Sequence, residues 1–233
     1  MLFNTLEYFL FLPISFLLYW SIKNTTTQNI LVLASSYVFY GWWDWRFLFL
    51  IFISTVVDYF VAIKIEKTDY KERKRVYLLL SIIFNLTILI FFKYYNFFIE
   101  SWVELLSSIG YHVKDVWTLK IILPVGISFY TFQTMSYSLD VYRNDIKATR
   151  DFISFASFVS FFPQLVAGPI ERFGRLNYQL FQKHTITWKN ISNGSRILLY
   201  GLFLKVCVAD NLSLIVDDFY SNPTAYGSWG AWQ

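Results

Sequence analysis

Long apolar runs, separated by short polar stretches, constrain the fold of this chain more than any other feature. A helix that crosses a bilayer needs about 20 apolar residues, and runs close to that length begin at Leu6, Phe47, Val76, Ile121 and Ile197. Only 15% of the 233 residues are charged, whereas a soluble domain carries about 25%. The polar surface is too small to cover a globule in water, so the sequence predicts an all-α, polytopic transmembrane helix bundle.

The predicted spans follow one another along the chain, so residues 1–233 are expected to form a single transmembrane domain of about six spans plus a re-entrant segment. The spans are Leu6–Ile22, Asn29–Trp43, Phe47–Ile63, Val76–Phe92, Ile121–Leu139 and Ile197–Ile215. Tyr94–Ile109 has an apolar face and is expected to lie along the membrane interface. Phe152–Ile170 contains Pro163, Gly168 and Pro169. It fits either a full span or a broken, re-entrant segment, and the re-entrant alternative is favoured.

The distribution of basic residues predicts the orientation of these helices. Fourteen of the 20 Lys and Arg residues lie in three stretches, Lys64–Arg75, Asp140–Asp151 and Glu171–Arg196. Cytoplasmic loops are enriched in Lys and Arg, so these stretches are expected in the cytoplasm and the N-terminus outside it. The protein is then a multi-pass protein of the inner (plasma) membrane. The net charge of +4 follows from this orientation, and no nucleic-acid partner is expected.

Polar side chains inside the apolar segments are candidates for function, because they are costly within a membrane. Asp58 lies near Ser54 and Thr55 in the third predicted span. A proton or a basic residue of another helix would lessen its charge, and a position at the interface is the alternative. The helix predicted after Pro124 and Gly126 carries hydroxyl and amide side chains over three turns. These side chains either hydrogen bond between helices of a bundle or line a polar passage.

The remaining candidates lie at breaks and charges in the apolar segments. Gln164 places an amide at membrane depth beside proline and glycine residues, which indicates either a kink or the wall of a cavity. Lys205 and Asp210 are five residues apart and do not share one face of an α-helix, so each is expected to meet a partner on another helix. The candidate tunnel-lining or structural polar residues are Gln133, Tyr137, Asp140, Arg143, Gln164, Pro169, Arg172, Lys205 and Asp210.

No catalytic residue is predicted within this chain. Histidine is the most frequent general base, and the two histidines, His112 and His184, fall in predicted polar loops open to water. The single cysteine, Cys207, lies in an apolar helix and is expected to pack or to face lipid. The sequence therefore offers no disulfide framework and no metal site. It also contains no HExxH, GxSxG, GxGxxG or Walker motif.

Three motifs in this order resemble the signatures of one family. They are ILPVGISFYTFQTMSYSLDVYR (Ile122–Arg143), FFPQLVAGPIERF (Phe161–Phe173) and GLFLKVCVADNL (Gly201–Leu212). The family is the membrane-bound O-acyltransferases (MBOAT), in particular the membrane subunits of alginate O-acetyltransferases. The similarity extends over essentially the whole chain. It implies an MBOAT-like bundle in which helices surround a thin region crossed by a tunnel.

The resemblance also implies a reaction. Members of the family pass an acyl group, usually acetyl, from a cytoplasmic donor to an extracytoplasmic polysaccharide. The implied donor is acetyl-CoA or an acyl carrier, with no cofactor held permanently, and a periplasmic acetyltransferase is an expected partner. The alternatives are a teichoic-acid D-alanylation transferase, a transporter, and a non-catalytic membrane protein.

One departure from the family pattern is large. The family's catalytic histidine belongs to an Arg-Trp-His motif that follows a DFSGYSD-like segment, and the chain stops at Gln233 before either motif. The chain is therefore expected to be a truncated N-terminal portion without activity of its own. A missing second half is also expected to leave the polar face of Ser128–Ser138 exposed to lipid and the chain poorly stable.

Overall fold

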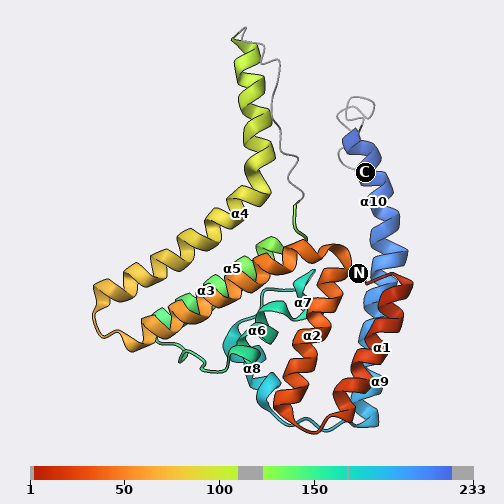
Figure 1. Cartoon of the computed structure of the whole chain (residues 1–233). Coiled ribbons are helices and arrows are strands. Elements are labelled where there is room, and N and C mark those ends of the chain that lie inside the picture. The colour runs from red at the N-terminus through yellow and green to blue at the C-terminus, as the bar shows by residue number, and fades with distance from the viewer. Residues whose placement is uncertain (1–2, 110–122, 167, 222–233) are drawn as a thin grey trace. The chain divides into compact units, whose positions relative to one another are not determined.

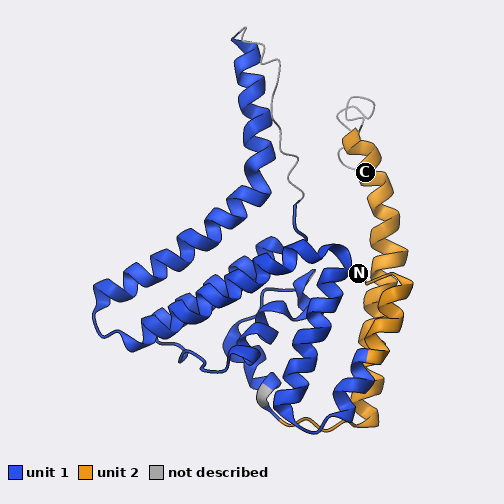
Figure 2. Cartoon of the chain, viewed as in Figure 1, with its two compact units in different colours: residues 1, 15–182 blue, residues 2–14, 183–233 orange. Residues whose placement is uncertain are grey.

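The computed structural model describes residues 3–109, 123–166 and 168–221, and the regular structure within these ranges is entirely helical. This confirms the predicted all-α class. The contacts between helices divide the described residues into two compact units (Figure 2). Residues 15–182 form the first unit, and residues 3–14 with 183–221 form the second.

Seven helices lie wholly within the first unit (Figure 1). They are α2 (Thr25–Asp44), α3 (Leu48–Lys67), α4 (Lys71–Ser108), α5 (Ile127–Tyr142), α6 (Phe152–Ser160), α7 (Phe162–Leu165) and α8 (Phe173–Phe181). Helix α5 packs against α3, α4 and α6, and α2 packs against α6 and α7. Helix α1 (Leu6–Ser21) is divided between the two units.

Three helical stretches of the described residues are long and apolar enough to cross a membrane: Thr25–Lys67, Lys71–Ser108 and Trp188–Ser221. Leu6–Ser21 and Phe152–Leu165 are shorter apolar helices. The chain changes direction within the first stretch, at the 3₁₀ turn η1 (Trp45–Phe47) between α2 and α3 (Figure 1). These stretches confirm the class of helical membrane protein, and the number of six spans stays a prediction.

Local capping explains where several helices begin. The Asn24 side chain accepts a hydrogen bond from the Thr26 amide (2.9 Å) at the start of α2. At α6, Asp151 Oδ1 accepts from the amide of Ile153 (3.0 Å) and from that of the next residue. Side-chain oxygens of this kind pair with amides that have no partner inside the helix.

Three helix boundaries differ from the predicted spans. Helix α4 continues without a break from the fourth predicted span into Tyr94–Ile109, which was expected as a separate interfacial helix. Helix α5 begins at Ile127, after a turn at Val125 and Gly126 in which Gly126 has a left-handed backbone (φ 77°). The last helical stretch begins at Trp188 instead of Ile197, since the Thr187 hydroxyl caps it (3.2 Å to the Asn190 amide).

The segment Phe152–Ile170 is broken, as its proline and glycine residues predicted. Helix α6 has nine residues and is about 14 Å long at the usual rise, well short of the roughly 30 Å hydrocarbon core. Helix α7 has four residues, and Pro163 occupies its first turn, where a proline is tolerated because no amide is needed. Whether the segment re-enters the membrane or spans it stays a prediction.

Aromatic side chains form much of the core of the first unit. The ring of Tyr137 on α5 lies 4.5 Å from Phe155 on α6 and 4.7 Å from Phe173 on α8. Phe158 meets Phe173 edge-on at 5.1 Å. All four rings are buried. Such tilted and edge-on ring pairs are the geometries that aromatic side chains prefer, and they fix α6 and α8 against α5.

The second unit contains one long helical stretch with a change of pitch. Helices α9 (Trp188–Phe203) and α10 (Asp210–Ser221) are joined by a π-helical segment, η2 (Leu204–Ala209). None of the residues in these three elements is buried. The first unit therefore contains the buried polar groups of the described chain.

Candidate functional site

The most enclosed polar cluster centres on Asp58, which is fully buried on α3. Its Oδ1 accepts hydrogen bonds from the hydroxyls of Ser81 on α4 and of Ser138 on α5 (3.1 Å for Ser138). Its Oδ2 accepts from Asn85 Nδ2 on α4 (2.7 Å). Asn85 Oδ1 in turn accepts from the Thr134 hydroxyl (3.4 Å). This cluster, called the Asp58 network below, joins three helices through neutral donors.

The structure answers one of the questions that the sequence left open about Asp58. Its carboxylate is buried in the bundle and has no salt bridge to a Lys or Arg among the described residues, whereas its depth in the membrane stays a prediction. The sequence did not identify Ser81 and Asn85 as its partners. Their spacing of four residues within the apolar run of α4 was the available signal, because it places both on one helix face.

The polar face of α5 is buried, so the prediction that Ser128–Ser138 would be exposed to lipid is wrong. Thr131, Gln133 and Thr134 are at most 2% exposed, because α3, α4 and α6 cover this side of the helix. Gln133 Nε2 donates a hydrogen bond to the Phe158 carbonyl (2.9 Å), near the end of α6. These contacts agree with hydrogen bonding between helices of a bundle.

The other candidates on α5 lie near its C-terminal end. The Tyr137 hydroxyl accepts a hydrogen bond from the Thr149 amide (2.9 Å), which ties the following loop to the helix. Asp140 is 5% exposed, and its Oδ1 lies 3.4 Å from a guanidinium nitrogen of Arg172. The Arg172 side chain is itself 69% exposed. Arg143 is exposed at the end of the helix.

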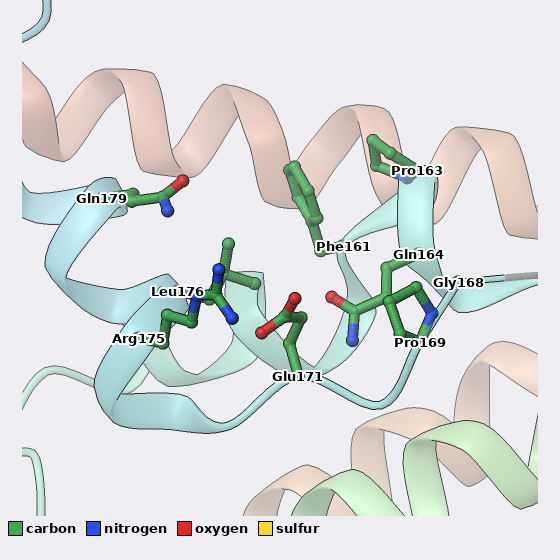
Figure 3. A pocket seen from close by; sticks show the side chains of 9 residues that line it. All are labelled: Phe161, Pro163, Gln164, Gly168, Pro169, Glu171, Arg175, Leu176 and Gln179. Atoms are coloured by element: carbon green, nitrogen blue, oxygen red, sulfur yellow. The ribbon is translucent and has the colours of Figure 1, made fainter. Parts of the chain in front are cut away.

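A pocket of about 260 Å³ lies next to the break in Phe152–Ile170. Its walls come from the α6–α7 break, the loop after α7, and α8 (Figure 3). The lining residues are Phe161, Pro163, Gln164, Gly168, Pro169, Glu171, Arg175, Leu176 and Gln179. Two of the predicted candidates, Gln164 and Pro169, therefore help to form this pocket, whereas the sequence had not singled out Glu171 or Arg175.

One neutral polar side chain, one acidic side chain and one basic side chain face the pocket. The amide of Gln164, the carboxylate of Glu171 and the guanidinium of Arg175 point toward the same space (Figure 3). Gly168 allows the chain to pass close to α7, since a Cβ at this position would lie 2.7 Å from Gln164 Cγ and 2.8 Å from its Cα. The pocket can therefore offer a hydrogen-bond acceptor and a fork of cationic donors to one small ligand.

Lys205 and Asp210 form an ion pair with each other, with 2.5 Å between Nζ and Oδ1. The prediction that each meets a partner on another helix is therefore wrong. The reason is the π-helical segment η2, in which hydrogen bonds run from i to i+5, so residues five apart lie on one face. The pair is exposed, and so is Cys207 between its members.

The histidines add no general base to either cluster. His184 is exposed between α8 and α9, and His112 lies outside the described residues. No group of three His, Cys, Asp or Glu side chains in the described chain is arranged to hold a metal ion. The buried chemistry of the first unit consists of the carboxylates of Asp58 and Asp140, hydroxyls and amides.

The described chain is thus a helical membrane protein with a buried polar network and a mixed-charge pocket. Sequence comparison identifies its relatives. A probable alginate O-acetylase (AlgI) of Pseudomonas syringae is 39% identical over 95% of this chain and 42% of its own length. The corresponding protein of Pseudomonas aeruginosa is also 39% identical, with the same coverage. The peptidoglycan O-acetyltransferase of Helicobacter pylori is 35% identical over 100% of this chain and 49% of its own length.

These relatives confirm the resemblance to the membrane-bound O-acyltransferase family, since the similarity to alginate O-acetylases and to a peptidoglycan O-acetyltransferase extends over 95–100% of this chain. The chain spans about half the length of the curated relatives that it matches. No family model and no solved structure matches the chain. The match to the Helicobacter pylori protein extends over the whole chain, so it includes the three signature motifs, Ile122–Arg143, Phe161–Phe173 and Gly201–Leu212.

Proposed function

We propose that this chain is part of a membrane O-acetyltransferase that transfers an acetyl group to a hydroxyl of an extracytoplasmic polysaccharide. The observation that carries the proposal is the sequence identity to alginate O-acetylases and to a peptidoglycan O-acetyltransferase. It is 35–39% over 95–100% of the chain. Alginate and the glycan of peptidoglycan share one chemistry as acceptors, a sugar hydroxyl. D-alanylation of teichoic acid is less favoured, because neither name refers to it.

In the proposed reaction, a hydroxyl oxygen of the polymer attacks the carbonyl carbon of an acetyl thioester. The carbon–sulfur bond breaks, an ester forms, and the thiolate leaves and takes up one proton as the hydroxyl loses one. A general base must take the hydroxyl proton, and the described residues supply no histidine at a buried site. In this account the base belongs to the part of the protein that the 233-residue chain lacks relative to its relatives, and the chain alone is inactive.

The acetyl donor, acetyl-CoA or an acyl carrier, is expected on the cytoplasmic side of the inner membrane. Three stretches of the chain are rich in Lys and Arg, one of them Glu171–Arg196. Because cytoplasmic loops are enriched in these residues, the side of the membrane where these stretches lie is proposed to be the cytoplasmic side. The pocket beside α8 carries Arg175 from this stretch and is our candidate for contact with the donor. The N-terminus is then extracytoplasmic, and a periplasmic acetyltransferase is the proposed partner on the acceptor side.

Complementation tests the function. The full-length protein is produced in an alginate-secreting Pseudomonas aeruginosa strain that lacks its own alginate O-acetylase, and ester-bound acetate is released by mild base from secreted alginate and from peptidoglycan. The proposal predicts restored esters on at least one polymer, and none with the 233-residue chain alone. A full-length protein that is present in the membrane but restores neither ester, while the host's own gene restores alginate acetylation, would contradict it.

A further inference from the structure

The Asp58 network has an unusual balance of charge. A buried carboxylate in a protein is normally paired with a cation or bound to a metal ion, and in a membrane this requirement is stronger. Asp58 is 0% exposed, yet its three hydrogen-bond partners are two serine hydroxyls and one amide. The salt bridges of the described residues do not include it. When Asp58 is ionised, the network therefore holds one negative charge that no side chain within it neutralises.

Two further oxygen atoms in the same region have no partner. Ser54 Oγ and Thr131 Oγ1 are buried and make no hydrogen bond. Ser54 lies one turn before Asp58 on the buried face of α3, and Thr131 lies one turn before Thr134 on α5. Buried hydroxyls without a partner are rare and call for an explanation, such as a bound water or ion.

The directions of the helices place these oxygens near the carboxylate. Asp58 in the second half of α3 accepts from Ser138 of α5, whereas Tyr40 of α2, shortly before α3, donates its hydroxyl to the Val125 carbonyl, shortly before α5 (2.8 Å). Helices α3 and α5 therefore run in the same direction. Ser54 lies four residues before Asp58, and Thr134 lies four residues before Ser138, so Ser54 and Thr134 lie at the same level of the bundle. Asn85 Oδ1 also lies at this level, because it accepts a hydrogen bond from Thr134.

We propose that the Asp58 network is a binding site for one monovalent alkali cation, with Na⁺ as the best fit. A charge of +1 balances the single carboxylate, whereas a divalent ion would leave an excess positive charge in the membrane. The donors are carboxylate, hydroxyl and amide oxygens, which suit hard cations. Each hydroxyl oxygen keeps lone pairs while it donates its proton, so Ser81 and Ser138 serve Asp58 and the cation together.

The proposed ligands come from α3, α4 and α5, so the cation fixes the three helices against one another. Asp58 and Ser54 supply oxygens from α3, Ser81 and Asn85 from α4, and Ser138 from α5. Calcium sites use several carboxylates, and here only one is present in the network. The site stands apart from the acetyl-transfer proposal, because none of its residues lines the pocket beside α8.

The first experiment measures Na⁺ binding to the purified full-length protein in detergent. Radiolabelled Na⁺ gives the stoichiometry, and the melting temperature is followed while Na⁺ replaces choline at constant pH and ionic strength. A ligand that binds only the folded state raises stability with concentration. The proposal predicts one saturable Na⁺ site per protein and a melting temperature that rises with Na⁺.

Two variants assign the site. Asp58→Asn keeps the size of the side chain and an acceptor for Ser81 and Ser138, and it is expected to abolish both Na⁺ responses. Ser54→Ala removes an oxygen without a partner, so the protein should be no less stable in choline but should bind Na⁺ about tenfold more weakly. Asp69→Asn removes an exposed carboxylate and is the matched control with unchanged binding.

A second control tests buried hydroxyls in general. Ser160 is buried on α6 and bonds to the Ala156 carbonyl (2.7 Å), so Ser160→Ala should leave Na⁺ affinity unchanged. Absence of saturable Na⁺ binding, or equal binding in the Asp58→Asn and wild-type proteins, would overturn the proposal. A melting temperature that responds to pH but not to Na⁺ would also overturn it, since the occupant would then be a proton. If Asp58→Asn does not fold, the Ser54→Ala result decides alone.

Discussion

Replacing Gly126 with alanine tests how the start of α5 is built. Gly126 has φ 77° and its carbonyl accepts from the amides of Phe129 (2.9 Å) and Tyr130 (3.2 Å) in the first turn. A left-handed backbone costs a residue with a Cβ about 1–2 kcal/mol. The new Cβ would also lie 2.5 Å from the backbone oxygen of Leu165, about 0.9 Å closer than ordinary contact. Such overpacking costs about 1–3 kcal/mol, so the expected loss is about 2–5 kcal/mol.

The assay is unfolding by SDS in mixed micelles, followed by the fluorescence of the nine tryptophans. Gly194→Ala is the matched control, because no atom of the described residues lies within 4 Å of a Cβ at this position inside α9. Alanine is the better helix former by about 1 kcal/mol, so this control should be unchanged or more stable. A Gly126→Ala protein within about 0.5 kcal/mol of wild type would refute both the backbone argument and the close contact with α7.

Substitutions at three further positions probe the first unit by the same assay. Phe155→Ala removes a fully buried ring that contacts Tyr137 and Phe173, and we expect a loss of about 3–5 kcal/mol; a loss below 1 kcal/mol would mean that the aromatic core is not packed as described. Gln133→Leu leaves the Phe158 carbonyl without its donor and should cost about 1–3 kcal/mol, whereas Gln133→Glu, which cannot donate when ionised, should cost at least as much. Arg172→Ala should change stability by less than about 1 kcal/mol, because its contact with Asp140 is long (3.4 Å) and its own side chain is 69% exposed, and pairs that reach the solvent contribute little; a larger effect would show that this side chain does more than meet Asp140.

The positions of the membrane helices could be predicted from the sequence because the bilayer sets the length of an apolar run. The predicted Phe47–Ile63 corresponds to α3 (Leu48–Lys67), and the predicted Asn29–Trp43 corresponds to α2 (Thr25–Asp44). The ends were less accurate, because polar residues next to a span can continue a helix without cost. The stretch before Ile197 shows this, since its helix starts nine residues earlier, at Trp188.

The Lys205–Asp210 pair could not be predicted because its spacing fits no α-helix face. Sequence reasoning assumed 3.6 residues per turn, whereas η2 is π-helical and brings residues five apart together. The largely apolar stretch Leu204–Ala209, LKVCVA, carries no local signal for this change of pitch. The error therefore concerned the geometry and not the choice of residues.

The candidate sites were predicted in part. Asp58 was recognised as a costly group in an apolar helix, but its partners could not be chosen until α4 and α5 were placed beside α3. Gln164 and Pro169 were selected for their position at a helix break, and both line the pocket. Burial of the α5 polar face was missed, because a sequence pattern does not show that neighbouring helices of the same chain can cover it.

Transfer of acetyl groups by the purified full-length protein is the most direct test of the central claim. The protein is placed in proteoliposomes with the proposed partner, a periplasmic acetyltransferase. An isotopically labelled acetyl thioester is supplied on one side, and soluble alginate or peptidoglycan fragments are supplied on the other. The account predicts label in the polymer that mild base releases as acetate. Absence of polymer-bound label, under conditions in which the relative from Pseudomonas aeruginosa transfers acetyl groups, would contradict it.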